Sequence, residues 1–350
     1  MGYDIGEFLV LLSVIFACSL AMSIAVERLA EKWGANFAGS ILLGLVTVMP
    51  EYLIVYFAVR NQEYDVALGS VAGAAAMLVT LGYGLVILTS TSWVSKRPVR
   101  VIQLSKTTQI DAVYLFATAV IAVLLGLHGN GLSLVDAAIL AIIFVAYAMH
   151  LYIDAQKKSR EHHEAGLPPS RVAWALLTLM LCGIVVLLVS ERFVHSLVGL
   201  ARDFGVPKLA IAVILAPIAS EMPEKLTAFV TVRRNGALAE ISICNFIGSK
   251  INHNSLLLAL MPMVVFLSGH GDSFPGIMVP AFWMMTGLTM IAGVSLSLGK
   301  LRQWQGWVFV LLFAVMIAVS VRFNQGVAPE DEGKTGTHEV VRECSGRIGC

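Results

Sequence analysis

Ten apolar stretches, each about 20 residues and so long enough to cross a lipid bilayer as a helix, constrain this chain more than any other feature. Inside lipid the backbone finds no water to bond, so spanning segments are helices or strands of a closed barrel. Only 13% of the residues are charged, well below the quarter or so that is usual in soluble domains. The sequence therefore predicts an all-α integral membrane protein with ten transmembrane helices. They lie near residues 7–27, 37–59, 65–90, 109–127, 132–153, 172–197, 207–232, 237–267, 275–298 and 304–321.

The longest polar interruption, residues 154–171, divides these helices into five and five. We expect a first unit over 1–153, a second over 172–321 and a polar tail over 322–350. Lysine and arginine collect in the loops that follow the odd-numbered helices. By the positive-inside rule that side is cytoplasmic, which makes the 154–171 loop cytoplasmic and both termini extracellular in the cell membrane.

Two glutamates interrupt the apolar stretches, and each directly follows a proline: Glu51 follows Pro50 and Glu224 follows Pro223. A carboxylate at the bilayer centre costs about 2.5–3.5 kcal/mol on insertion scales, so it is normally paired or bound to an ion. The proline removes a backbone donor and disturbs the helix, which leaves carbonyl oxygens beside the carboxylate. The pattern predicts a buried cation site, with an ion pair inside the helix bundle as the alternative.

The two halves of the chain carry these signals in the same order. Nine residues after each of the two glutamates comes an arginine, Arg60 or Arg233, and a small-residue stretch then begins at Gly69 or Cys244. Because five helices separate the copies, they cross the membrane in opposite directions. Inverted repeats with interrupted helices and a site near the midplane are typical of secondary transporters. We therefore predict two inverted five-helix repeats.

These residues resemble the cation/calcium exchanger superfamily, which includes sodium/calcium and proton/calcium antiporters. Its two α-repeats each carry a motif similar to G-T-S-x-P-E on one helix and G-N-x-x-G-S-N-x-x-[ND] on the next. The second copy is matched by Ser220–Glu224 and Asn245–His253, and the first by Thr47, Pro50 and Glu51. The resemblance places the α-repeats near 37–90 and 207–267.

The resemblance also implies a cation site built from the second, third, seventh and eighth helices. In it, Glu51 and Glu224 match the central carboxylates, Thr47 and Ser220 match the motif threonines, and Ser249 matches a motif serine. The full set of candidate metal ligands is Glu51, Glu224, Thr47, Ser220, Glu221, Asn245, Ser249 and His253.

Several positions depart from the family pattern. In the first repeat, Val48, Ala74, Ala75 and Leu78 stand where the motif has oxygen-bearing residues. In the second repeat, Glu221 replaces a serine, Lys250 replaces an asparagine, and His253 replaces an acidic or amide residue. Ca²⁺ takes six to eight oxygen ligands, so the replacement of these residues directly affects which ions the site would select. Two carboxylates one helical turn apart are not expected to stay ionised together without a cation, and an imidazole titrates near neutral pH. A proton could therefore compete with the metal.

Three of the candidate ligands also have a structural interpretation. Glu221 could pair with Lys225 or Lys250 without contacting an ion. His253 could form a hydrogen bond between helices, and Asn245 could join neighbouring helices in the same way.

The expected function is secondary active antiport by alternating access, in which a divalent cation is exchanged for Na⁺. Ca²⁺ is the expected divalent cation. The alternative is a proton-coupled antiporter of Ca²⁺, Mg²⁺ or Mn²⁺. An intramembrane enzyme is more distant, because no H-E-x-x-H or G-x-S-x-G motif is present. Beyond the transported ions we expect no cofactor, and the partners are small inorganic cations and the bilayer. A net charge of +1 gives no sign of nucleic-acid binding, and the oligomeric state is left open.

Overall fold

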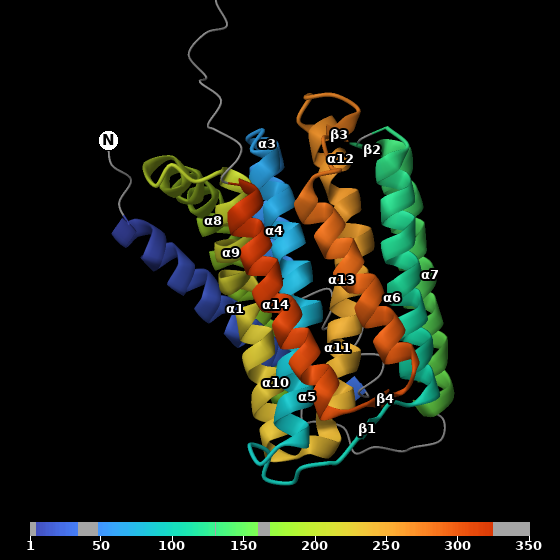
Figure 1. Ribbon diagram of the computed structural model, residues 1–350. Coiled ribbons are helices and arrows are strands. Elements are labelled where there is room, and N and C mark those ends of the chain that lie inside the picture. Colours follow the sequence, from blue (N-terminus) through green and yellow to red (C-terminus); the bar gives the residue numbers. More distant parts are fainter. Residues whose placement is uncertain (1–4, 34–47, 130, 160–168, 325–350) are drawn as a thin grey trace, which may run out of the picture.

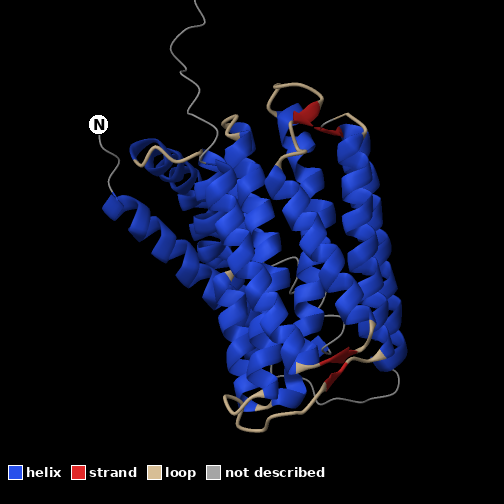
Figure 2. Ribbon diagram, in the orientation of Figure 1, coloured by secondary structure: helices blue, strands red, loops and turns tan. Residues whose placement is uncertain are grey.

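The computed structural model describes residues 5–33, 48–129, 131–159 and 169–324, and nearly all of these residues are helical (Figures 1 and 2). Thr47, the middle of the predicted loop and the tail beyond residue 324 lie outside the described residues.

The first half contains six α-helices and one π-helix within the described ranges. They are α1 (Ile5–Trp33), α3 (Met49–Arg60), α4 (Tyr64–Met77), η2 (Leu78–Gly82), α5 (Tyr83–Thr91), α6 (Lys106–Leu127) and α7 (Leu134–Ser159). Because α4, η2 and α5 follow one another without a break, they form one long membrane helix, residues 64–91.

The second half repeats this order. Its elements are α8 (Pro169–Asp203), α9 (Lys208–Ser220), α10 (Met222–Arg234), η3 (Gly236–Leu238), α11 (Ala239–Asn252), η4 (His253–Leu257), α12 (Leu258–Leu267), α13 (Pro280–Ser297) and α14 (Gln303–Asn324). Elements η3 to α12 again form one long membrane helix, residues 236–267.

Each of the ten predicted stretches contains helix in its described part, and residues 37–47 of the second stretch lie outside the described residues. Among the described residues, seven helices are long and apolar enough to cross a membrane. The second and seventh predicted stretches hold shorter helices, α3 and the pair α9 and α10, and the tenth holds α14. One boundary differs: α7 continues to Ser159, beyond the predicted end at 153. The extra residues are mostly polar, but they include alanine, glutamine and two lysines, which favour helix.

The two halves share their local backbone as well as their sequence signals. Helices α3 and α10 both begin with Met-Pro-Glu. Helices α4 and α11 are both 14 residues long, and each continues into a five-residue π-helix. Leu78 and His253 therefore occupy the same position, the first residue of the π-helix. Short π-helical segments inside α-helices occur frequently at functional sites.

Two short β-ribbons, which the sequence analysis did not predict, join the halves at opposite ends of the bundle (Figure 2). Strand β1 (Ile102–Gln103) pairs antiparallel with β4 (Lys300–Leu301), with Ile102 opposite Leu301. Strand β2 (Gly131–Ser133) pairs antiparallel with β3 (Ser273–Pro275), with Leu132 opposite Phe274. Both ribbons connect a loop of the first half to a loop of the second.

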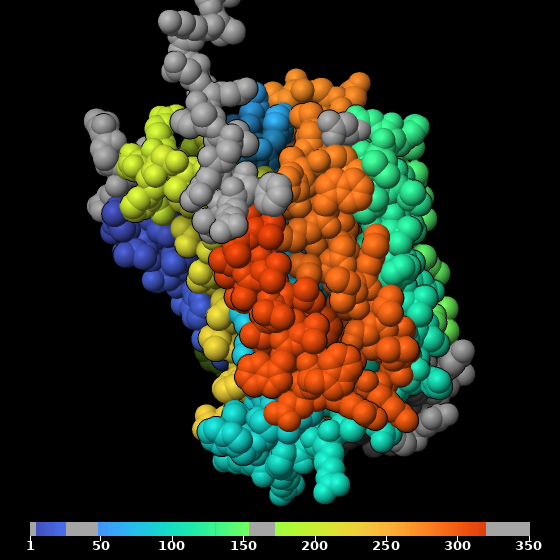
Figure 3. Space-filling model, in the orientation of Figure 1, coloured from blue at the N-terminus to red at the C-terminus, as the bar shows by residue number. Residues whose placement is uncertain are grey.

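The outer helices leave large apolar side chains uncovered. Leu188 on α8 is 71% exposed and Ile142 on α7 is 67% exposed. In water such surfaces would associate, whereas in a bilayer they contact acyl chains at no cost. Figure 3 shows the side chains of α13 and α14 covering another face of the bundle.

The centre of the bundle depends on a close approach of α4 to α9. A Cβ atom built on Gly73 would lie 2.1 Å from the carbonyl oxygen of Val213, and one on Gly69 would lie 2.7 Å from that of Leu209. No side chain fits in that space, so two glycines one turn apart let the backbones touch. Close contact at small residues is a common way for helices to associate in membranes.

We expect Gly73→Ala to lower the free energy of unfolding by about 1–3 kcal/mol, because α4 has to move away from α9 to admit the methyl group. The matched control is Gly287→Ala in α13, where a Cβ atom meets nothing within 4 Å and the change is expected to be neutral or stabilising. Unfolding of both variants in detergent, followed by circular dichroism, measures the difference. Equal stability of the two variants would contradict the packing argument.

Candidate cation site

The seventh membrane span is broken at Glu221. Helix α9 ends at Ser220 and α10 begins at Met222, with Pro217 inside the first and Pro223 at the start of the second. Each proline removes a backbone donor, so the helix cannot continue through this segment unperturbed. The break places Glu221 between two helices inside the protein, where its side chain is only 1% exposed.

Glu51 and Glu224 both lie in the first turn of a helix, α3 or α10, and both are buried. The first turn exposes backbone N–H groups without intrahelical partners and carries a partial positive charge. A carboxylate there is stabilised by about 0.3–1 kcal/mol, and by more where it is partly buried. The repeated Met-Pro-Glu sequence thus places an acidic group at a favourable position in each half.

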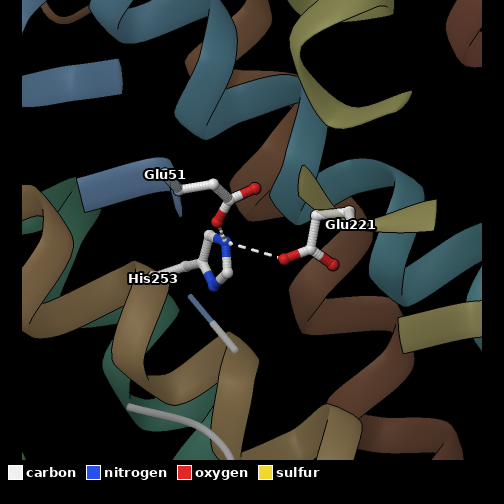
Figure 4. A group of neighbouring side chains, drawn as sticks. All are labelled: Glu51, Glu221 and His253. Carbon is white, nitrogen blue, oxygen red and sulfur yellow. Dashed lines mark hydrogen bonds and ion pairs between the residues drawn. The ribbon is translucent and has the colours of Figure 1, made fainter. Parts of the chain in front are cut away.

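Glu51, Glu221 and His253 form one cluster, in which a potential ligand atom of each lies within 4.8 Å of the others (Figure 4). The Nε2 atom of His253 lies 2.5 Å from Oε2 of Glu51 and 3.5 Å from Oε1 of Glu221. Its Nδ1 atom lies 2.7 Å from the backbone oxygen of Ser249, to which it can donate. All three side chains are buried, and they come from α3, the α9–α10 break and the start of η4.

Two buried lysines lie beside this cluster. The Lys225 ammonium forms an ion pair with the carboxylate of Glu221 and donates to the Glu221 backbone oxygen at 3.1 Å. It also lies 5.9 Å from the ring centroid of Phe246. The Lys250 ammonium donates to Oδ1 of Asn254 at 2.5 Å. Of the two partners that the sequence analysis considered for Glu221, the structure therefore selects Lys225.

Glu224 lies outside the cluster and instead pairs with Asn245. Its Oε1 atom accepts a hydrogen bond of 2.6 Å from the amide of Asn245, while Oδ1 of Asn245 has no hydrogen-bond partner among the described residues. Glu224 and Asn245 thus form a pair on α10 and α11, and Glu224 is not a member of the three-residue cluster.

Two of the other predicted ligands, Ser220 and Ser249, contact the cluster. The Ser220 hydroxyl donates to Oε1 of Glu51 at 2.9 Å, which joins it to the cluster. Ser249 contributes its backbone oxygen to His253, whereas its buried hydroxyl has no partner within the described part of the chain. Thr47 lies outside the described residues.

The third membrane span contributes few oxygen atoms to the site. Ala74, Ala75 and Leu78 are fully buried there, and the nearby Ser70 hydroxyl has no hydrogen-bond partner among the described residues. Leu78 is the position that corresponds to His253. The polar groups are therefore concentrated on the second repeat, as its sequence indicated.

Two features of the site lie outside the prediction from sequence: the position of Lys225 beside the cluster and the contact between Tyr52 and Asn252. Lys225 follows Glu221 by four residues, a spacing at which opposite charges meet on one helical face, so a signal for the pair was present. The Tyr52 hydroxyl donates to Oδ1 of Asn252 at 2.5 Å and joins α3 to α11. No sequence signal pointed to that contact, because the two residues are 200 positions apart.

A multi-pass helical membrane protein with two similar halves, interrupted helices and buried acids at the breaks has the architecture of a secondary transporter. Comparison with known proteins agrees. The family described as sodium/calcium exchanger protein matches residues 4–153 and 174–322, and the chain belongs to that family. It is therefore a member of a transporter family and not an enzyme, and its relatives carry inorganic cations across membranes.

Similar structures and sequences cover almost the whole chain. The crystal structure of the H⁺/Ca²⁺ exchanger CAX superposes with a TM-score of 0.73 at 21% identity, over 91% of this chain and 86% of that one. The sodium-calcium exchanger NCX_Mj superposes with a TM-score of 0.64 at 21% identity, over 90% of this chain and 97% of that one. The membrane protein MJ0091 of Methanocaldococcus jannaschii is 22% identical over 90% of this chain and 97% of its own length.

These matches confirm the predicted fold of ten transmembrane helices in two repeats, the predicted family and the multi-pass membrane location. At such low identity the two superpositions establish the fold alone. The orientation of the termini, the boundaries of the units and the assignment of ligands to the site stay predictions.

We expect Lys225→Met to lower the free energy of unfolding by about 3–5 kcal/mol, because it leaves the buried Glu221 carboxylate without its cationic partner. The control is Lys208→Met, which breaks a partly exposed pair with Glu63 at 2.9 Å and should change stability by at most about 1 kcal/mol. Denaturation in detergent measures both. The double variant Glu221→Met/Lys225→Met should recover most of the loss, and failure to do so would count against the pairing as the cause.

Proposed function

We propose that this protein is an antiporter that exchanges a divalent cation for protons at the Glu51–Glu221–His253 cluster. The supporting observation is the composition of the buried site. Three carboxyl groups, those of Glu51, Glu221 and Glu224, lie among three basic nitrogen groups, those of Lys225, Lys250 and His253.

Charge balance is the physical basis of this proposal. Buried charges of one sign have to be neutralised, since uncompensated charge in a medium of low dielectric constant is strongly unfavourable. Here the protein's own nitrogen groups supply the positive charge that a metal ion supplies in an all-oxygen site. When a dication enters, the site therefore holds excess positive charge unless other positive charge is released. Protons bound at the site are the positive charge that can be released.

The residues that surround the two clustered carboxylates also favour protons over Na⁺ as the counter-ion. Glu51 contacts His253 and Ser220, and Glu221 contacts Lys225 and His253, so most of their partners are basic nitrogens. Na⁺ requires oxygen ligands, and the third span offers alanine and leucine where the family motif has serine and asparagine. A full set of neutral oxygens for additional Na⁺ ions is not available at those positions.

Transport also requires that the site open to each side in turn. Helices α1 and α8 pack along one another at one side of the bundle, where Phe8 stacks on Phe193 with ring centroids 5.6 Å apart (Figure 1). The hydroxyls of Ser23 on α1 and Thr227 on α10 are 3.1 Å apart. We infer that this helix pair shifts against the bundle, which exposes the cluster to alternate sides.

Transport into proteoliposomes tests the proposal. An outward proton gradient, imposed without Na⁺, should drive labelled Ca²⁺ or Mn²⁺ to accumulate inside against its own gradient, and a protonophore should abolish the accumulation. Glu63→Gln, which alters an acid away from the site, should behave as wild type, and Glu51→Gln should not accumulate the ion. Accumulation driven by a Na⁺ gradient and unaffected by the protonophore would assign the coupling to Na⁺ instead. Downhill flux alone would indicate a channel.

Replacing the ion pair by neutral groups should weaken the dependence of transport on pH. In the double variant Glu221→Ser/Lys225→Met, the site regains the motif serine and loses both members of the buried ion pair, without leaving either charge unpaired. The apparent affinity for the dication should then vary less steeply with pH than in wild type, as initial rates measured between pH 5.5 and 8.5 would show. An unchanged slope would contradict a role for this pair in coupling.

A further inference from the structure

The imidazole of His253 is arranged as metal-binding imidazoles commonly are. Its Nδ1 atom lies at hydrogen-bond distance, 2.7 Å, from the backbone oxygen of Ser249, and its Nε2 atom faces the carboxylates of Glu51 and Glu221. A histidine that binds a metal usually donates its other ring N–H to a backbone carbonyl or a carboxylate, which fixes the ring and its tautomer. Because Nδ1 is used by Ser249, Nε2, which lies 2.5 Å from Oε2 of Glu51, is the ring nitrogen available to an ion between the two acids (Figure 4).

The local backbone holds this ring in a defined place. His253 is the first residue of η4, and its Nδ1 contact reaches back about one helical turn, to the carbonyl four positions earlier. The side chain is fully buried, so packing also restricts it. Leu78 stands at the same position of the first repeat and offers no donor atom, so His253 is unmatched in the other half.

This donor set differs from that of a calcium site. Ca²⁺ is bound by six to eight oxygens, and Mg²⁺ by an octahedron of oxygens. Imidazole nitrogen is a ligand for Zn²⁺, Fe²⁺ and similar ions, and Zn²⁺ is commonly bound by histidine together with carboxylates. Two carboxylates and one imidazole therefore favour a first-row transition-metal ion, for which three protein ligands and one or more waters are a sufficient set.

We propose that the transported dication is a first-row transition-metal ion, with Zn²⁺ and Co²⁺ preferred over Mn²⁺ and all three over Ca²⁺, and that Nε2 of His253 is one of its ligands. This inference rests on the proposed antiport function and names the class of substrate. The order among the three metals follows the general rise in affinity from Mn²⁺ through Co²⁺ to Zn²⁺ at sites with nitrogen ligands.

Binding to the purified full-length protein in detergent provides the first test. Competition of Zn²⁺, Mn²⁺ and Ca²⁺ against Co²⁺, followed by the visible absorption of bound Co²⁺, should give the proposed order. In His253→Asp, which restores an acidic residue of the family motif, Co²⁺ affinity should fall about tenfold or more, and Ca²⁺ should become a better competitor. His270→Asp, on an exposed loop, should change neither.

The spectrum of the bound ion separates coordination from a merely structural role of His253. Pulsed electron paramagnetic resonance of bound Mn²⁺ should show coupling to a directly bound ¹⁴N nucleus in wild type and in His270→Asp, and the coupling should be absent in His253→Asp. Absence of that coupling in wild type would overturn the assignment of His253. If His253→Asp does not fold, the wild-type spectrum and the wild-type order of affinities still decide.

Flux measurements distinguish failure of this inference from failure of the proposed function. Proton-driven accumulation of Ca²⁺ that exceeds accumulation of Zn²⁺ and Mn²⁺ would overturn the metal preference and leave the antiport proposal standing. Absence of coupled flux for every one of these ions would overturn antiport itself. Proton-driven accumulation of Zn²⁺ above Ca²⁺ would support both.

Discussion

The contact of His253 with Glu51 and Glu221 is the interaction on which the centre of this protein depends. It joins a helix of the first repeat to two segments of the second, so it holds the halves together beside the break of the seventh span. The helix breaks are necessary for it, because an unbroken seventh span would not place Glu221 between helices. Partners around the cluster, Ser220 and Lys225 among them, then satisfy the remaining oxygens of the two carboxylates.

The backbone of the protein is nearly symmetric, whereas its chemistry is not. Both repeats contain the Met-Pro-Glu helix start and a 14-residue helix that ends in a π-helix. In the first repeat, however, glycines and alanines serve the close packing of α4 on α9, and in the second repeat the matching helix carries Asn245, Lys250 and His253. One half thus supplies mainly a packing surface and the other most of the polar groups, which is possible because similar backbones can carry different side chains.

Much of this could be predicted from the sequence. Apolar length alone located all ten membrane helices, and the Pro223–Glu224 pair located the break in the seventh span, because both signals depend on local physics that few tertiary contacts can override. The partners inside the site were less accessible. The four-residue spacing of Glu221 and Lys225 favours their pairing. That Glu224 contacts Asn245 while Glu51 contacts His253 depends on how four helices turn relative to one another, which no spacing in the sequence specifies. The β-ribbons were missed because their strands are only two or three residues long.

Those ribbons determine which parts of the bundle can slide. Strands held by backbone hydrogen bonds resist shear, since relative movement of the two loops has to break several bonds at once. The ribbons fasten loops of one half to loops of the other at both ends of the molecule. Helices α1 and α8 have no strand at their ends within the described residues, and they meet through side chains, which adjust by small rotamer changes. The molecule therefore combines two backbone-bonded fastenings between its halves with a helix pair, α1 and α8, whose contacts with each other and with α10 are made by side chains.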